Sequence, residues 1–210
     1  MSCTVMSPVT RALAFAICVK NRYTDSRIFR EKMQSPCIAG MDEAGRGCLA
    51  GPVVAGAVIL PKRSPKQLLR DSKTLTAKQR ETAFEWIVKH CVYGVGEASH
   101  AEIDTLGIKP ATQLAMQRAL EQLGVAPDLL RIDGCDGFAF DLPHESHIRG
   151  DSRFAEIAAA GILAKVTRDR RMQEYAREFP EFGFDRHKGY GVKLHLELIA
   201  TRRFCAIHRK

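Results

Sequence analysis

Apolar residues fall into short runs that predict strands and into longer periodic stretches that predict helices. The runs at 37–42 and 51–60 are rich in small and β-branched residues and are joined by a glycine-rich bend, so we predict two strands there. Similar runs at 91–98 and 129–133 predict two more. Strands come first and then alternate with helices, which is typical of an α/β domain with a mixed central sheet.

Helical periodicity begins at Thr76, which forms a capping-box pattern with Gln79. In the helix that follows, apolar residues such as Ala83 and Ile87 recur at helical spacing. The later helices that we predict span 101–107, 110–124, 152–179 and 193–203.

Composition places the chain among ordinary globular proteins. Of its 210 residues, 45% are hydrophobic and 27% are charged. No apolar run reaches the roughly 18 residues that a membrane span needs, so we expect no membrane association. The net charge of +8 favours a polyanionic partner without specifying one. The seven cysteines are odd in number and contain no C-x-x-C pair, which predicts reduced thiols in a cytoplasmic protein.

The first 35 residues are predicted to be a poorly ordered extension of a domain that spans 36–210. Residues 12–19 are apolar and could form the core of a signal peptide, which leaves secretion as an alternative. That core is short, and Lys20 follows it instead of a small-residue cleavage site. Because Met33 stands just before the domain, a chain that begins there is expected to keep its activity.

An acidic pair, Asp42 and Glu43, interrupts the first predicted strand. A buried carboxylate is costly unless something pairs with it. Neighbouring residues on a regular strand point to opposite faces, so both acids can serve one site only if the strand ends or bends at them. Gly45 and Gly47 supply such a bend, and we therefore predict a strand end that faces a site.

Two further acids occupy comparable places. Asp133 ends the strand at 129–133, and Asp151 follows Gly150 just before a helix. Clustered carboxylates need a cation to stay ionised, and oxygen ligands select Mg²⁺ or Mn²⁺. Two such ions stabilise in-line attack on a phosphodiester. The alternative is that these acids are separate turn and cap residues, with Asp151 as a helix N-cap.

Other polar motifs are weaker indicators. The basic stretch 183–191 carries Lys188 and places Tyr190 between two glycines, which suits phosphate contact and stacking on a sugar or base, although a plain solvated loop is the alternative. The sequence HESH at 144–147 has the wrong spacing for a zinc-protease helix and is assigned to a loop. Asp169 is interpreted as a helix-surface ion-pair partner.

Several of these motifs together resemble one family. The segments GMDEAGRG (40–47), DSKTL (71–75), AAAGILAKVTRD (158–169) and HKGYG (187–191) occur in the order and spacing of bacterial ribonuclease HII. The resemblance covers about residues 36–208. It implies an α/β ribonuclease H-like fold, in which helices flank a mixed central sheet and a helical segment follows.

The resemblance also implies an activity. The expected enzyme hydrolyses the RNA strand of RNA–DNA hybrids and incises duplex DNA 5′ of embedded ribonucleotides, leaving 3′-OH and 5′-phosphate ends. It would act as a monomer with two Mn²⁺ or Mg²⁺ ions. The implied catalytic metal ligands are Asp42, Glu43, Asp133 and Asp151. The implied substrate-binding residues are Gly45, Arg46, Gly47, Lys73, Lys188 and Tyr190.

Two positions depart from the family pattern. Gly161 stands where the family usually has serine, and Val192 where it usually has threonine. Two competing interpretations remain. A non-catalytic hybrid-binding protein would not need all four acids. Ribonuclease HIII has a similar catalytic domain but carries a larger N-terminal substrate-binding domain than 35 residues can supply.

Overall fold

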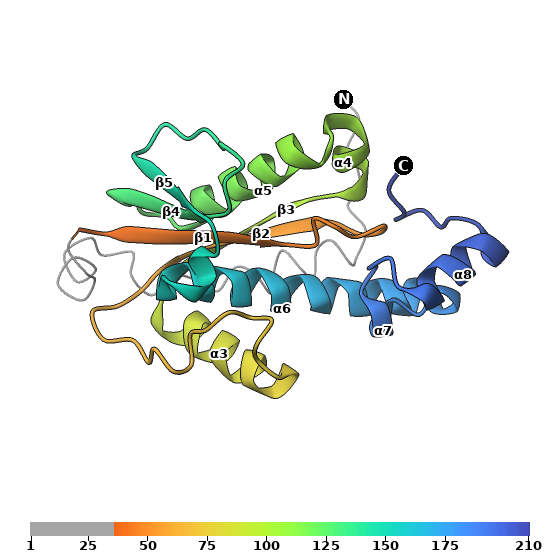
Figure 1. Ribbon diagram of the computed structural model, residues 1–210, viewed down its shortest axis with the longest axis horizontal. Helices are drawn as coiled ribbons and strands as arrows, with labels where there is room; N and C mark the ends of the chain where they lie inside the picture. Colours follow the sequence, from red (N-terminus) through yellow and green to blue (C-terminus); the bar gives the residue numbers. More distant parts are fainter. Residues whose placement is uncertain (1–35) are drawn as a thin grey trace, which may run out of the picture.

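A five-stranded sheet forms the centre of the computed structural model, which describes residues 36–210 (Figure 1). The predictions made for residues 1–35 therefore lie outside the described residues. The strand order is β3-β2-β1-β4-β5, antiparallel from β3 to β1 and parallel from β1 to β5, so the predicted mixed sheet is confirmed. The strands are β1 (Ile38–Ala44), β2 (Val53–Ile59), β3 (Val92–Ala98), β4 (Leu129–Asp133) and β5 (His144–His147).

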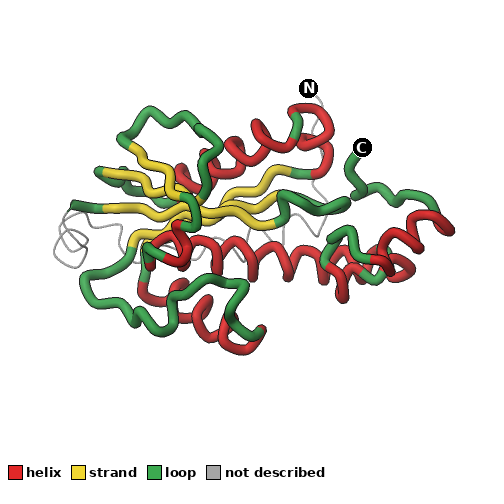
Figure 2. Tube along the Cα trace, viewed as in Figure 1, coloured by secondary structure: helices red, strands yellow, loops and turns green. Residues whose placement is uncertain are grey.

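Helices cover both faces of this sheet (Figure 2). One face packs against α5, and the other packs against α6, which in turn contacts α3. Within the described range, no helix is both long and apolar enough to cross a membrane. The helices are α3 (Ala77–His90), α4 (His100–Leu106), α5 (Ile108–Gln122), α6 (Ala155–Glu178), α7 (Phe184–His187) and α8 (Lys193–Arg202), with 3₁₀ turns η1 (Gly150–Ser152) and η2 (Pro180–Phe182).

Small residues let α6 lie close to the sheet. Its first turns are Ala-rich and fully buried from Ile157 to Ala164, because they face β1 and β2. Larger apolar side chains such as Ile162 fill the space between α6, α3 and the sheet. Truncating a buried isoleucine of this kind to alanine costs about 2–5 kcal/mol. The position of α6 matters for function because it borders the acids described below.

Most predicted elements are found, with shifted ends. The capping box is confirmed, since the Thr76 hydroxyl accepts from the Gln79 amide at 3.2 Å and the Gln79 side chain accepts from the Thr76 amide at 2.9 Å. Helix α5 begins two residues before Pro110 because Gly107, at φ +81°, ends α4 and opens α5. Helix α6 begins at Ala155 because the preceding residues form η1.

The loop assignment of residues 144–147 is wrong, because they form the edge strand β5. Strand β5 pairs in parallel with β4 through backbone hydrogen bonds. Its side chains are polar, so its sequence lacks the apolar pattern that predicts a strand. Glu145 also binds the neighbouring strand, accepting from Arg131 Nε at 2.6 Å. Charged and polar residues are common on edge strands because they discourage pairing with another chain.

Candidate active site

Three carboxylates from separate elements come together at one end of the central strands. Asp42, Asp133 and Asp151 each place an oxygen within 4.8 Å of the others, and we call these residues the acid triad. Asp42 and Asp133 follow Met41 and Ile132, the last residues paired in the parallel ladder between β1 and β4. The ends of two adjacent parallel strands therefore bring these two acids side by side.

The third acid is held in place by the second. Asp133 Oδ1 accepts a hydrogen bond of 2.7 Å from the amide of Gly150, the first residue of η1. This bond places the next residue, Asp151, beside the other two acids, where it is only 9% exposed. The interpretation of Asp151 as a helix N-cap is wrong, because Phe154 is the N-cap of α6 and makes no side-chain capping bond.

The predicted strand end at the acidic pair is also wrong in detail. Strand β1 continues to Ala44 and pairs Glu43 with Ala55 of β2, while its pairing with β4 stops at Met41. Glu43 lies outside the close group of triad oxygens, and its Oε1 lies 3.5 Å from Arg46 Nη1. Burial raises the pKa of Glu43, and the Arg46 charge opposes that rise.

The triad carries more negative charge than its surroundings balance. Burial, followed by Glu43 and Asp133, raises the pKa of Asp42 well above its usual value. Burial and the charge of Asp133 also raise the pKa of Asp151, which Lys73 partly offsets. Closely spaced, electrostatically strained carboxylate oxygens are the donor set that Mg²⁺ or Mn²⁺ prefers. The residues present therefore fit a divalent cation.

The glycine at the first departure from the family pattern faces the acid triad. A Cβ at Gly161 of α6 would collide with Asp42 Oδ2. The carboxylate of Asp42 thus occupies the space where a larger residue at 161 would begin. Any side chain at this position requires the Asp42 carboxylate to turn.

The two glycines beside Arg46 have different roles. Gly45 has φ +95°, and a Cβ there would collide with the guanidinium of Arg168, so the fold itself requires glycine. Gly47 is exposed, and a Cβ there would meet no described atom within 4 Å. The space above Gly47 is therefore open to a ligand.

Arg46 is fixed by an acid that the sequence did not single out. Its Nη1 and Nη2 donate to the two carboxylate oxygens of Asp136 at 2.5 and 2.8 Å. Asp136 follows β4 and is flanked by Gly134 and Gly137, both at positive φ. This glycine-rich turn after a strand was the available signal, but nothing in it indicated Arg46 as the partner.

Tyr190 lies beside the Gly47 loop and is 37% exposed. Its backbone forms an isolated antiparallel bridge with Cys48. Its ring centroid lies 5.3 Å from Lys165 Nζ and 5.6 Å from Arg168 Cζ, within the range of cation–π attraction. The exposed part of this ring is available for stacking on a ligand.

The two predicted substrate lysines differ in freedom. Lys73 is 81% exposed on its side chain and lies 3.7 Å from Asp151 Oδ2, a contact that solvent screens. Lys188 donates to the carbonyl of Asp185 at 2.7 Å, and burial lowers its pKa. Asp169, in contrast, forms the predicted ion pair, accepting from Lys165 Nζ at 2.8 Å.

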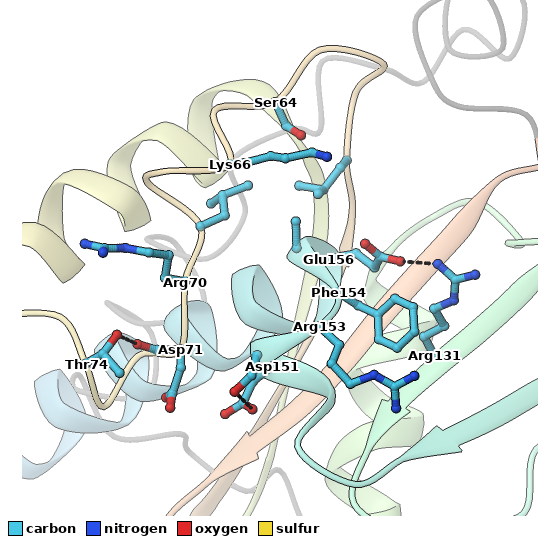
Figure 3. Close-up of a pocket in the computed structure, with 14 residues that line it drawn as sticks. Ser64, Lys66, Arg70, Asp71, Thr74, Arg131, Asp151, Arg153, Phe154 and Glu156 are labelled. Carbon is cyan, nitrogen blue, oxygen red and sulfur yellow. Dashed lines mark hydrogen bonds and ion pairs between the residues drawn. The ribbon is translucent and has the colours of Figure 1, made fainter.

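A groove of about 700 Å³ extends from Asp151 between the segment 60–74 and the start of α6 (Figure 3). Asp71 and Asp151 lie at one end of it, and Arg131 binds Glu156 at the other. The groove is lined by cationic and by acidic side chains, which are Lys66, Arg70, Arg131 and Arg153 on the one hand and Asp71, Asp151 and Glu156 on the other.

Comparison with known proteins identifies the family. The sequence profile described as Ribonuclease HII matches residues 39–210. A Ribonuclease HII of Geobacter metallireducens is 51% identical over 175 residues, which cover 82% of each chain. A Ribonuclease HII of Burkholderia thailandensis is 49% identical over 174 residues, which cover 82% of this chain and 81% of the relative.

Solved structures agree with this result. A chain in the structure of the PCNA:RNase HII complex from Archaeoglobus fulgidus aligns with a TM-score of 0.70 and 26% identity, covering 82% of this chain and 93% of that one. Bst-RNase HIII in complex with Mn²⁺ aligns with a TM-score of 0.64 at 16% identity, covering 82% of this chain and 65% of that one, which shows the shared fold alone. The profile match and the curated relatives together show that the chain belongs to the ribonuclease HII family.

Proposed function

We propose that the protein is an endoribonuclease that hydrolyses the RNA strand of RNA–DNA hybrids and incises duplex DNA 5′ of embedded ribonucleotides. The observation that carries this proposal is the acid triad, which lies close to an open glycine backbone and a partly exposed tyrosine. Membership of the ribonuclease HII family supports the same activity.

The triad, with Glu43 beside it, is proposed to hold two divalent cations, Mg²⁺ or Mn²⁺. When bound, such ions lower the pKa of a water molecule and neutralise charge that develops on the phosphate. Asp42 and Asp133 supply oxygens from rigid strands, and Asp151 supplies one from η1. Glu43 is positioned by Arg46 at the rim of the same site.

The reaction is hydrolysis of one phosphodiester bond. Water adds to phosphorus, the bond from phosphorus to the 3′ oxygen breaks, and the products carry a 3′-OH and a 5′-phosphate. The side chains of this protein orient the strand for that step. Lys73 and Lys188 are proposed to contact phosphates, and the cations of the groove beyond Asp151 would continue those contacts along the duplex.

Recognition of the ribonucleotide is proposed to use the loop around Arg46. The exposed backbone at Gly47 lets a ribose approach, and the Asp136 carboxylate keeps the neighbouring Arg46 guanidinium in one orientation. A 2′-OH can then hydrogen-bond to this backbone, which is how a protein distinguishes RNA from DNA. Tyr190 is proposed to stack on the adjacent deoxyribose. We infer that a single cytoplasmic chain performs all of these roles.

The competing function is hybrid binding without cleavage, which the cations of the groove would support without the acid triad. A cleavage assay on a duplex with one ribonucleotide, titrated with Mn²⁺ or Mg²⁺, separates the two. The proposal expects incision that rises with metal concentration and disappears in Asp42→Asn, while Asp42→Asn still binds the hybrid. Asp141→Asn is the matched control, because Asp141 is exposed and lies outside the triad. Binding without metal-dependent incision by the wild type would favour the competing function.

A further inference from the structure

The loop that carries Gly47 is hydrogen-bonded to two other segments. We call residues 45–51 the reading loop, residues 187–191 the tyrosine loop and residues 205–210 the tail. The Leu49 amide donates to the Gly189 carbonyl of the tyrosine loop at 2.8 Å. The Gly51 amide donates to the Ile207 carbonyl of the tail at 2.9 Å. The reading loop is thus bonded to both segments through its backbone.

One side chain of the tail binds three carbonyls of the reading loop. Arg209 donates from Nη2 to Gly45 at 2.7 Å, from Nη1 to Arg46 at 3.0 Å and from Nε to Gly51 at 2.9 Å. No carboxylate among the described residues forms an ion pair with it. Burial lowers the pKa of Arg209 to about 10, so it remains a cation at neutral pH.

The geometry of this contact is specific to arginine. The three acceptors lie at both ends of the reading loop, and a planar guanidinium presents its donors in a fixed fork that reaches all of them. A lysine ammonium has the same charge but is a single point on a flexible stem. Charge alone therefore cannot reproduce the restraint that Arg209 places on the loop.

The preceding residue of the tail binds the tyrosine loop through a second histidine. His208 Nδ1 accepts from the Cys205 amide at 2.9 Å, so its proton is on Nε2. That Nε2 donates to His195 Nε2 at 3.1 Å, which leaves the proton of His195 on Nδ1. His195 Nδ1 then donates to the Tyr190 carbonyl at 2.9 Å. This assignment follows from the hydrogen-bond network.

The chain of bonds from His208 to Tyr190 holds only while both imidazoles are neutral. Both residues are buried, with His195 fully buried and His208 only 4% exposed. A proton added to His195 would place two N–H groups against each other. The tail therefore reaches the reading loop through a cation and the tyrosine loop through neutral rings, and neither side chain belongs to the acid triad.

We propose that His208 and Arg209 are positioning residues that set the spacing between the reading loop and the tyrosine loop. This inference rests on the proposed function, in which the two loops contact adjacent sugars of one strand. Because those sugars are covalently linked, both contacts form together only at one loop spacing. An error of about 1 Å in such an arrangement can lower a rate by up to about 100-fold.

The test compares two substrates: duplex DNA with a single ribonucleotide, and a continuous RNA–DNA hybrid. The variants are Arg209→Lys, Arg209→Gln and His208→Gln. The control is Arg202→Gln, which removes the same charge as Arg209→Gln from an exposed residue whose side chain forms no hydrogen bond or ion pair within the described range. Each variant's thermal midpoint is measured, and kcat/KM is compared well below the lowest midpoint.

We expect Arg209→Lys and Arg209→Gln to lower kcat/KM on the single ribonucleotide about tenfold more than on the continuous hybrid. His208→Gln should lower the same ratio, and it carries the test if the Arg209 variants do not fold. Arg202→Gln should leave the ratio unchanged. Because Arg209→Lys keeps the positive charge, a loss in this variant would show that the shape of the guanidinium is required.

An unchanged ratio in the Arg209 and His208 variants, or full rescue by Arg209→Lys, would overturn the inference alone. Equal losses on both substrates would do the same, because they indicate a merely structural role. A wild-type protein that binds Mn²⁺ or Mg²⁺ but cleaves neither substrate would overturn the proposed function, and this inference with it.

Discussion

The acid triad brings three carboxylates within 4.8 Å of one another, whereas the two loops are held by hydrogen bonds. The Arg209 guanidinium binds three carbonyls of the reading loop, and the neutral imidazoles of His208 and His195 bind the tyrosine loop. In the triad, burial and like charges raise the pKa of Asp42. In the tail, Arg209 donates to three carbonyls of the reading loop. The triad concentrates like charges that a cation would offset, whereas the tail restrains the two loops through hydrogen bonds.

This contrast indicates how the two regions divide the work. Strained carboxylates gain stability when a cation arrives, so the triad is suited to bind metal and to act on a phosphate. A loop held by hydrogen bonds gains nothing from a metal cation, and movement of the loop would break those bonds. The reading loop is therefore suited to measure the shape of the substrate, and its precision comes from the tail.

The largest expected effect comes from neutralising the triad. Asp42→Asn should lower cleavage about 1,000-fold or more, which is about 4 kcal/mol in activation free energy. The same change should raise the free energy of unfolding of the metal-free protein by about 0.5–2 kcal/mol, because it removes repulsion from Glu43 and Asp133. Cleavage kinetics and denaturant unfolding measure the two effects.

The control for this variant is Asp141→Asn, which removes an exposed carboxylate outside the triad and should change neither quantity. A less stable Asp42→Asn protein would contradict the view that the triad is strained in the absence of metal.

The next largest effects are expected at the two glycines beside Arg46, one of which is required for stability and the other for substrate recognition. Gly45→Ala should destabilise the protein by about 3 kcal/mol, because it combines a left-handed φ with a collision against Arg168. Gly47→Ala should change stability by less than about 0.5 kcal/mol but lower cleavage about tenfold, because its methyl group enters the open space. Thermal unfolding and kcat/KM distinguish them.

Equal destabilisation by the two alanines would mean that Gly47 is also required by the fold. Full activity of Gly47→Ala would show that no substrate backbone approaches there.

A smaller effect is expected at the tyrosine. Tyr190→Ala removes a stacking surface that contributes roughly 1–3 kcal/mol, so incision at a single ribonucleotide should fall by about one to two decades more than cleavage of a continuous hybrid. The ratio of kcat/KM on the two substrates, variant against wild type, is the measurement. Equal losses would mean that Tyr190 supports binding in general.

The smallest effect concerns pH. Burial lowers the pKa of His195 and His208 below the usual 6.5. Just below pH 6.5, the unfolded chain therefore binds more protons than the folded protein does. Stability should therefore be full above pH 6.5 and should decline as the pH falls toward the lowered values. The raised pKa values of Asp42 and Asp151 act with the opposite sign, so the test is the difference between wild type and His208→Gln.

Between pH 7 and about pH 5, His208→Gln should lose less stability than the wild type. Denaturant unfolding at each pH measures this loss. His144→Gln, at an exposed histidine of β5, is the control. A variant with the pH dependence of the wild type would show that His208 is not held neutral by its network.

The sequence predicted the part of the site that depends on where strands end. Acids at the ends of buried strands indicated that Asp42 and Asp133 would meet, and the chemistry of clustered carboxylates indicated a metal. The edge strand β5 escaped prediction because its side chains are polar and its pairing depends on backbone bonds to β4. The precise end of β1 also depended on its partners, since its pairing with β4 stops before its pairing with β2 does.

Contacts between distant positions could not be predicted from periodicity. Arg46 and Asp136 are 90 positions apart, and Arg209 and Gly45 are 164 apart. Nothing near Arg209 in the sequence distinguishes it from exposed arginines such as Arg202. The motif around Tyr190 drew attention to the tyrosine loop, but the tail that supports it carries no signal of its own.

The most direct test of the central claim maps the cut made by the wild-type protein with Mn²⁺ or Mg²⁺. The substrate is duplex DNA with one ribonucleotide, beside an all-DNA duplex of the same sequence. The account predicts a single metal-dependent incision 5′ of the ribonucleotide, with a 3′-OH upstream and a 5′-phosphate on the ribonucleotide, and no cut in the all-DNA duplex. Incision elsewhere, equal cutting of both duplexes, or no cutting with either metal would contradict it.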